Sequence, residues 1–262
     1  MTTESENLSH DLVGVIPAAG QATRMGKLPC SKEILPIALQ NTASGSQVRV
    51  LGDLLIDEFD KADVGKVIIA TAPWKLDIEQ FFGVRRDGIG LEYVYLDSES
   101  TVHTIDACCA RVAGRTVVFG FPDLVLPPSK GYRQLLGRQQ ELDADVVLGL
   151  FGTSHPHMMD MVQCADDGRV LDIAIKPPGK SDEYAKTWCT AVWGDRFTTY
   201  IHEHLERASR AFDRELYVGD LLLAAIGDGL DVFGLVLSDQ DVIDAGTPET
   251  YARVIRHFSD VT

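Results

Sequence analysis

The chain has 262 residues, of which 45 % are hydrophobic and 24 % are charged, an ordinary balance for a globular protein that can bury a sizeable core. Its 24 basic and 39 acidic side chains give a net charge of −15, which argues against a nucleic-acid-binding surface because such surfaces are basic. A local group of cations can still bind a small anion on an acidic protein, so phosphorylated ligands remain open.

Cysteine content and the N-terminal composition bear on location. The five cysteines are odd in number and form no C-x-x-C, so neither a disulfide framework nor a zinc site is indicated. The first stretch, MTTESENLSHD, is polar and acidic and lacks the basic start and apolar core of a signal peptide. No apolar run approaches the ~20 residues of a membrane span. We therefore expect reduced thiols, a cytoplasmic location and no membrane partner.

The first half of the chain alternates apolar runs with amphipathic ones. Residues 1–10 are expected to be a flexible tail, and residues 11–262 a single domain. In chain order the pattern predicts a strand at 13–16, a helix at 47–60, strands at 66–70 and 91–96, a helix at 101–112, a strand at 116–121, a helix at 132–142 and a strand at 145–151. This alternation predicts an α/β fold with a mainly parallel sheet covered on both faces.

The pattern changes after residue 151. Asp166, Asp167 and Gly168 separate the apolar runs 161–164 and 170–175, which predicts a hairpin. There follow a strand at 187–193, helices at 196–208 and 218–225, strand-like runs at 230–237 and 241–244, and a helix at 248–258 that has proline near its first turn. We expect this less regular half to cover one edge of the sheet.

The segment GVIPAAGQATRMGKLPCSKEILPI, residues 14–37, places cations in a loop directly after a strand. Ligands of open α/β sheets bind outside the carboxyl ends of the strands. Arg24 can clamp a phosphate with two parallel hydrogen bonds, and Lys32 can supply a point charge. Small residues at the start of the loop let the backbone offer amides to an anion: Ala18, Ala19 and Gly20. An ordinary joint with solvated cations is an equal alternative, and the stretch matches neither a P-loop nor a dinucleotide fingerprint.

Several segments that occur in a fixed order carry a family resemblance. The loop is similar to the pattern L-A-G-G-x-G-T-R-L followed by P-K-x-L-x-P. The other segments are FPD at 121–123 for G-D, IKP at 175–177 for E-K-P, VGDLL at 218–222 before GLDV at 229–232, and VIDAGTPE at 242–249 for W-x-D-x-G-T-P-E. Together, over residues 13–255, they resemble the sugar-1-phosphate nucleotidylyltransferases of the glucose-1-phosphate thymidylyltransferase and uridylyltransferase type.

The resemblance implies a Rossmann-like three-layer α/β/α nucleotidyltransferase fold with a mixed, mainly parallel sheet. It implies an enzyme, an NDP-sugar pyrophosphorylase, that couples a nucleoside triphosphate to a sugar-1-phosphate and releases pyrophosphate, with dTTP or UTP favoured. A sugar-phosphate oxygen attacks the α-phosphorus, which requires that two anions be aligned and their charge neutralised. A homodimer is a further family expectation. Because little chain follows the GTPE segment, we expect no second transferase domain.

The resemblance also assigns roles to individual residues. The catalytic cations would be Arg24 on the departing phosphates, Lys32 on the α-phosphate and Lys176 on the sugar phosphate. Mg²⁺ would be the cofactor, held by Asp123 and Asp244. The nucleotide-binding residues would be Ala18, Ala19, Gly20, Arg24, Lys32 and Thr101, and the sugar-phosphate-binding residues would be Lys176, Trp188, Thr190 and Tyr217. Turn, cap, surface and core roles are the alternatives for the same side chains.

The chain departs from the family pattern at three places. Ala22 replaces a glycine of the opening loop, and Ile175 replaces the glutamate of E-K-P, for which Asp182 or Glu183 are candidate substitutes. The glutamine that would recognise a pyrimidine aligns near Leu96, so CTP stays open. The alternatives are a cytidylyltransferase for a non-sugar phosphate, such as phosphocholine or a polyol phosphate, and a non-catalytic nucleotide-sensing homologue.

One further cluster lies outside these motifs. The stretch SHPHMMD brings together His155, His157 and Asp160. An H-x-H pair can bind a metal. No additional ligand is evident, so a surface loop is the favoured interpretation.

Overall fold

The computed structural model describes residues 12–42, 45–128, 131–178, 182–208 and 215–259, and the predicted tail at 1–10 lies outside these ranges. The first half contains β1 (Leu12–Ala18), η1 (Thr23–Met25), η2 (Lys32–Ile34), β2 (Pro36–Thr42), β3 (Gly45–Val50), α2 (Asp53–Lys61), β4 (Lys66–Thr71), α3 (Leu76–Phe82), β5 (Arg85–Arg86), β6 (Ile89–Tyr95), α4 (Thr101–Val112), β7 (Thr116–Gly120), β8 (Leu124–Val125) and α5 (Gly131–Leu142).

The second half contains β9 (Val146–Gly152), η3 (Pro156–Met158), β10 (Asp160–Cys164), β11 (Val170–Ile175), η4 (Asp182–Tyr184), β12 (Lys186–Trp193), α6 (Asp195–Ala208), α7 (Val218–Gly227), β13 (Val232–Asp241), β14 (Ile243–Asp244) and α8 (Pro248–Ser259). Most of the predicted elements are present within a few residues of their expected bounds.

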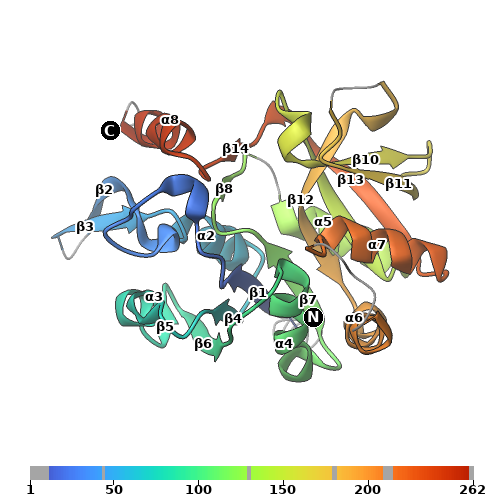
Figure 1. Cartoon of the computed structure of the whole chain (residues 1–262), viewed down its shortest axis with the longest axis horizontal. Helices are drawn as coiled ribbons and strands as arrows, with labels where there is room; N and C mark the ends of the chain where they lie inside the picture. Colours follow the sequence, from blue (N-terminus) through green and yellow to red (C-terminus); the bar gives the residue numbers. More distant parts are fainter. Residues whose placement is uncertain (1–11, 43–44, 129–130, 179–181, 209–214, 260–262) are drawn as a thin grey trace, which may run out of the picture.

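A ten-stranded mixed sheet runs through the molecule (Figure 1). Its path is β5-β6-β4-β1-β7-β12, after which β12 pairs with β9 along its length and with β10 near its start. Among the described strands, β5, β11 and β12 run against the other seven of the ten. The predicted mixed, mainly parallel sheet is therefore confirmed.

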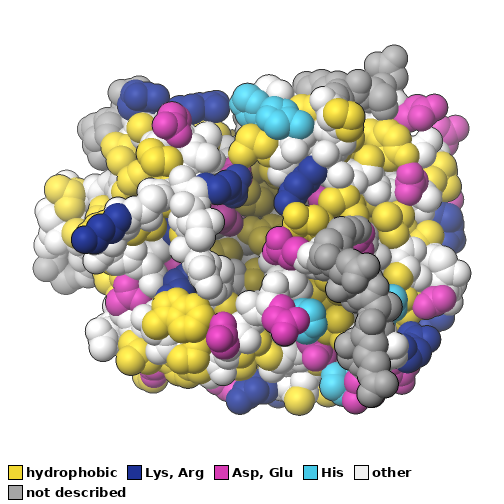
Figure 2. All heavy atoms as spheres, viewed as in Figure 1, with side chains coloured by type: hydrophobic (Ala, Val, Ile, Leu, Met, Phe, Trp, Pro, Cys, Tyr) yellow, Lys and Arg dark blue, Asp and Glu magenta, His cyan; other side chains and the backbone are white. Residues whose placement is uncertain are grey.

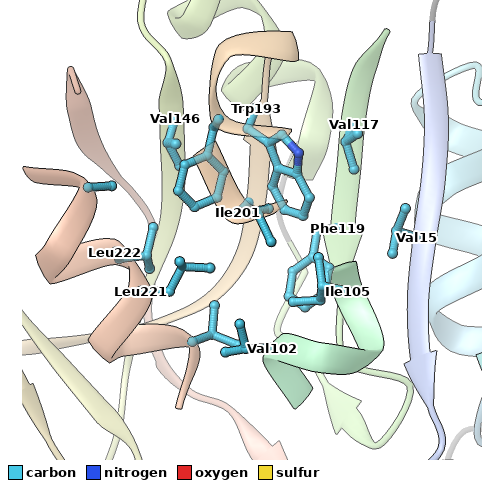
Figure 3. Packing of buried hydrophobic residues seen from close by; sticks show 14 of the residues in the cluster. Val15, Val102, Ile105, Val117, Phe119, Val146, Trp193, Ile201, Leu221 and Leu222 are labelled. Carbon is cyan, nitrogen blue, oxygen red and sulfur yellow. The ribbon is translucent and has the colours of Figure 1, made fainter. Parts of the chain in front are cut away.

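Helices cover both faces of this sheet because the strand side chains alternate between them. Val13 and Val15 of β1 pack with α4, α6 and α7 on one face, whereas Ile16 packs with α2, α3 and α5 on the other. Figure 3 shows the first face, where Val102, Ile105, Ile201 and Leu221 converge on Val15, Phe119 and Trp193. The two cores make the predicted three-layer α/β/α arrangement.

Two expectations about local structure were wrong. The run 47–60 is not one helix, because its first residues form β3, which pairs with β2 in a separate hairpin before α2 begins at Asp53. The second half does not merely cover an edge of the sheet, because β9, β10, β11, β12 and β13 all join it. The end of the chain then returns to the first half, where α8 packs on β2 (Figure 1).

The loops and turns that carry the predicted site residues lie at one edge of the sheet. The parallel strands β1, β4, β6 and β7 all end there. Because β12 runs the opposite way, it begins at this edge, and β10 begins and β11 ends beside it. The loop after β1, the Asp123 turn and Lys176 therefore meet at one place. Within the described ranges, no helix has the length and apolar character needed to cross a bilayer.

Candidate active site

Two clefts adjoin at this edge of the sheet. The first has a volume of about 510 Å³ and is bordered by the β1–η1 loop, Trp74, residues 97–101 and Asp123. The second, of about 280 Å³, is bordered by Arg24, Lys176, Tyr217 and Asp244, and it shares Asp123 with the first. Figure 2 shows a hollow in the middle of this face, with basic and acidic side chains around it. Charged groups from both halves of the chain thus surround the junction.

Two cation–carboxylate pairs lie at the junction. Lys32 Nζ donates to Asp123 Oδ2 at 2.5 Å, and Arg24 Nη2 donates to Asp244 Oδ2 at 3.4 Å. Burial alone would raise the pKa of Asp123, but the Lys32 ammonium brings that pKa below its usual value. Burial likewise opposes the charge on Lys32, and Asp123 more than offsets this, so the Lys32 pKa is raised. Both members of this pair are charged near neutral pH.

The two carboxylates come together through a short ladder. β8 pairs antiparallel with β14, which places Asp244 opposite Leu124, and Ala245 N donates to Asp123 O at 2.9 Å. Burial, followed by the charge of Asp123, raises the pKa of Asp244. Asp244 Oδ1 is buried without a hydrogen-bond partner among the described residues. Two carboxylates thus lie side by side, each with one cationic partner, and Asp244 keeps an oxygen that no donor among the described residues uses.

Gly246 permits the Arg24–Asp244 contact. A Cβ atom on Gly246 would lie 2.5 Å from Arg24 Nη2 and 2.7 Å from Asp244 Oδ1. We expect Gly246→Ala to displace both side chains and to lower kcat/KM about tenfold or more, since small misplacements of charged groups are costly in such sites. Steady-state kinetics with a circular dichroism melt tests this, and an active, normally folded variant would contradict it. Gly137→Ala is the matched control, since a Cβ there meets open space and Gly137, in α5, borders neither cleft among the described residues.

A buried ion pair that the sequence analysis missed lies beneath the loop. Lys75 Nζ donates to Glu33 Oε1 at 2.8 Å, to Ala18 O at 2.6 Å and to Gly20 O at 3.2 Å. Lys75 and Glu33 are 6 % and 5 % exposed. Burial raises the pKa of Glu33 even though Lys75 opposes that shift. Lys75 thus ties the end of β1 to η2, the turn that carries Lys32.

The β1–η1 loop has a strained backbone. Ala22 has φ of 53°, in the left-handed region that disfavours residues with a Cβ atom. It precedes η1, and Met25 N donates to Ala22 O at 2.9 Å. The family pattern has glycine at this position. Ala22 adopts the left-handed conformation that glycine would adopt without strain, so the turn is kept at a local energetic cost. Strain of this kind is typical of functional loops.

The predicted nucleotide residues are placed as follows. Ala19 and Gly20 border the first cleft, and Thr101 borders both clefts. Ala18 is buried beneath them, and its carbonyl is taken by Lys75. Leu96 packs against the core, so it does not occupy the cleft position of a base-recognising glutamine.

The predicted sugar-phosphate residues divide into two groups. Lys176, Trp188 and Tyr217 border the second cleft, and Lys176 Nζ lies 3.8 Å from the centroid of the Tyr217 ring. Lys176 has φ of 44°, so the chain turns sharply out of β11 at this residue. Thr190 is 2 % exposed, and its hydroxyl lies against Gly149 in the core. Its side chain therefore does not reach the cleft.

Of the SHPHMMD cluster, Asp160 borders the second cleft, whereas its two histidines border neither cleft among the described residues. The described residues contain no group of three or more His, Cys, Asp or Glu side chains that could hold a metal. His155 and His157 are exposed, and their rings lie 6.1 Å apart. The five cysteines are unpaired, as expected of reduced thiols.

Comparisons with known proteins give likeness in structure alone. No protein-family model and no curated protein sequence matches the chain. A candidate glucose-1-phosphate thymidylyltransferase from Bacillus anthracis, solved with sucrose, is similar with a TM-score of 0.79 at 18 % identity, over 96 % of each chain. A UTP-bound UGPase from Acinetobacter baumannii has a TM-score of 0.73 at 15 % identity, over 94 % of this chain and 92 % of the other.

A third solved structure broadens the range of acceptors among the similar proteins. The inositol-1-phosphate CTP transferase from T. maritima has a TM-score of 0.71 at 14 % identity, over 93 % of this chain and 94 % of the other. Each of the three similarities spans nearly the whole of both proteins. The chain therefore has the Rossmann-like fold of the sugar-phosphate nucleotidyltransferases.

Proposed function

We propose that the chain is a Mg²⁺-dependent nucleotidyltransferase that joins a nucleoside triphosphate to a sugar-1-phosphate and releases pyrophosphate and a nucleotide sugar. The observation that carries this proposal is the pairing of Lys32 with Asp123 and of Arg24 with Asp244 where two clefts meet. Two anionic substrates need such a junction, because their repulsion must be neutralised while they are aligned. The shared fold supports the reaction class. That residues 11–262 act as one domain is part of the proposal.

The nucleotide would lie in the first cleft. Backbone amides of the loop at Ala19 and Gly20 would receive the triphosphate, with Arg24 on the departing phosphates and Lys32 on the α-phosphate. Its base and ribose would then lie against residues 97–101, which border the same cleft.

The acceptor would lie in the second cleft with its phosphate on Lys176. A phosphate oxygen of the acceptor attacks the α-phosphorus, the bond to the bridging oxygen of the β-phosphate breaks, and pyrophosphate leaves. Lys32 and Arg24 stabilise the negative charge that grows on the leaving group. Proton transfer is not required, because the attacking phosphate oxygen is already ionised near neutral pH.

The Asp123–Asp244 pair suits magnesium. Asp244 Oδ1 is buried without a hydrogen-bond partner among the described residues, and burial together with the charge of Asp123 raises the pKa of that carboxyl, which supports a cation between the two carboxylates. Mg²⁺ binds through one or two carboxylates together with phosphate oxygens and waters, so two carboxylates suffice. When bound, the ion would neutralise the phosphates and help to align them. Arg24 and Lys32 would then be free to shift from the carboxylates to the substrate.

The resemblance favours dTTP or UTP, but one observation supports CTP as the alternative nucleotide. The first cleft is bordered by Asp97 and Glu99, whose carboxylates only accept hydrogen bonds when ionised. A carboxylate complements the exocyclic amino group of cytosine, whereas the equivalent position of thymine is an acceptor. CTP therefore belongs in the substrate test beside dTTP and UTP.

Pyrophosphate release tests the proposal directly. The five nucleotides dTTP, UTP, CTP, GTP and ATP are each combined with glucose-1-phosphate, inositol-1-phosphate and phosphocholine in the presence of Mg²⁺. Release that needs both a nucleotide and a sugar-1-phosphate supports the proposal. Release only with CTP and a non-sugar phosphate would move the chain to the cytidylyltransferase alternative. Nucleotide binding without turnover would support the sensing homologue instead.

Lys176→Ala should separate the two substrates. We expect the acceptor KM to rise about tenfold or more, the loss typical of one charge-assisted hydrogen bond, while the nucleotide KM changes less than about twofold. Initial rates over a grid of both concentrations measure this. Lys66→Ala, which removes a partly buried lysine paired with Glu92 at the opposite end of the strands, is the control. Equal changes in the two KM values would place Lys176 elsewhere.

A further inference from the structure

The second cleft contains a carboxylate with no assigned role. Asp160 is the first residue of β10 and stands directly opposite Ile175 of β11 in the antiparallel register. Side chains of directly opposed residues lie on the same face, about 4.5–5.5 Å apart at Cβ. Ile175 replaces the glutamate of the E-K-P pattern, and Asp160 places a carboxylate on the same face from the neighbouring strand. Asp160 borders the cleft together with Lys176, Trp188 and Tyr217.

Of the two substitutes considered from the sequence, only Glu183 has a described side chain, and it does not fill this place. Glu183 is exposed in η4 and does not border the cleft among the described residues. The side chain of Asp182 lies outside the described part of the structure.

Asp160 is held by the start of α7. The Gly219 backbone N–H donates to its carboxylate. A Cβ atom on Gly219 would lie 2.7 Å from Asp160 Oδ2 and 3.2 Å from Ile175 Cγ1, so the close approach depends on glycine. One N–H uses one of about four lone-pair sites on a carboxylate, which leaves the others for a ligand. The geometry thus fixes the carboxylate while keeping acceptor capacity in the cleft.

Keeping this charge buried is unfavourable for the protein. Burial raises the pKa of Asp160 to about 6, the nearby charge of Asp220 adds to the rise, and Lys176 and the Gly219 N–H oppose it. Because the folded pKa exceeds the reference value of 3.8, the stabilising contribution is complete below pH 3.8 and is lost as the pH rises through 6. A neutral isostere should thus be at least as stable at pH 7.5. Groups that reduce stability in this way are typical of functional sites.

The polar groups of the cleft match hydroxyls better than a second cation. The Lys176 ammonium already lies over the Tyr217 ring, so a quaternary ammonium at that face would meet a like charge. The Trp188 indole borders the cleft, and its Nε1 is buried without a hydrogen-bond partner among the described residues. An acceptor carboxylate that borders the cleft suits a ring that carries several hydroxyl groups.

We propose that Asp160 is a specificity-determining residue whose carboxylate accepts hydrogen bonds from ring hydroxyls of a sugar or cyclitol phosphate held by Lys176. This inference rests on the proposed function, because it takes the second cleft as the acceptor site. It narrows the acceptor to a polyhydroxylated ring and disfavours phosphocholine.

The test compares wild type with Asp160→Asn, using the best nucleotide and acceptor of the pyrophosphate panel and a set of deoxy analogues of that acceptor. We expect the variant to raise the acceptor KM about tenfold or more with the nucleotide KM nearly unchanged. In wild type, one deoxy analogue should have a KM that is higher than that of its parent acceptor by a similar factor. In the variant, the KM values of that analogue and its parent should differ less than about twofold, because the hydrogen bond between Asp160 and the missing hydroxyl is already absent.

Controls separate this role from a structural one. Asp166→Asn changes an exposed carboxylate in the turn of the same hairpin and should behave as wild type. A thermal melt at pH 7.5 should show Asp160→Asn to be no less stable than wild type. Normal wild-type turnover with an unchanged acceptor KM in Asp160→Asn would overturn this inference alone. Absence of release by wild type with every substrate pair would overturn the proposed function and this inference with it.

Discussion

Asp123→Asn is expected to lower kcat by about 10²- to 10³-fold while the fold is retained, the loss typical when one preorganised charge is removed from a transition state. The substitution keeps the shape of the side chain but removes the charge that Lys32 faces and that would bind the metal. Asp123 lies where the two clefts meet, so the change affects both substrates at once. Initial rates of pyrophosphate release under saturating substrates measure it.

The matched control for this variant is Asp239→Asn. Asp239, in β13, is an exposed carboxylate that pairs with Lys186 of β12, and it borders neither cleft among the described residues. A titration with Mg²⁺ adds a second measurement, since Asp123→Asn should require more metal for half-maximal activity. Near-normal turnover with an unchanged metal requirement would rule out Asp123 as a metal ligand.

Lys75→Met is expected to destabilise the protein by about 3–5 kcal/mol and to weaken nucleotide binding. The substitution leaves Glu33 buried without its cation and frees the carbonyls of Ala18 and Gly20. The β1–η1 loop would then lose the tie to η2 that sets the position of Lys32. Urea denaturation measures the stability change, and calorimetric titration with a nucleoside triphosphate measures the binding change.

The double variant Lys75→Met with Glu33→Gln separates the ion pair from simple loss of volume. It should be more stable than Lys75→Met alone, because no uncompensated charge remains. Burial raises the folded pKa of Glu33 above 4.5, so its stabilising contribution is complete below pH 4.5 and is lost as the pH rises. The loss in Lys75→Met should therefore be smaller at pH 5 than at pH 8. Additive effects and a flat pH dependence would contradict this account.

The fold was largely predictable because local patterns determine it. Runs such as KVIIA at 66–70 are apolar, short and bounded by turns, which specifies a buried strand. The prediction of one helix at 47–60 was wrong. The apolar spacing there fits a helix locally, but pairing with β2 decides the structure of its first residues. Such pairing is a tertiary effect and leaves little trace in local periodicity.

The site was predictable only where a motif marked it. Asp123 and Asp244 were identified from their motifs, and the structure brings the two together through β8 and β14. Lys75 lies outside any motif, and Asp160 belongs only to the SHPHMMD stretch, which we interpreted as a surface loop. Their importance depends on burial and on which strand lies beside which, as in the register that sets Asp160 against Ile175. The only available signal was a charged residue within a largely apolar neighbourhood, which is common elsewhere in the chain.

The return of β14 and α8 to the first half has a consequence for synthesis. The partner of Lys32, Asp123, lies 91 positions later in the sequence, whereas the partner of Arg24, Asp244, lies 220 positions later. Contacts between such distant positions close large loops and form late in folding. A nascent chain emerging from the ribosome can thus build most of the sheet before Asp244 arrives. Nascent chains that have not yet reached Asp244 would therefore hold no complete carboxylate pair.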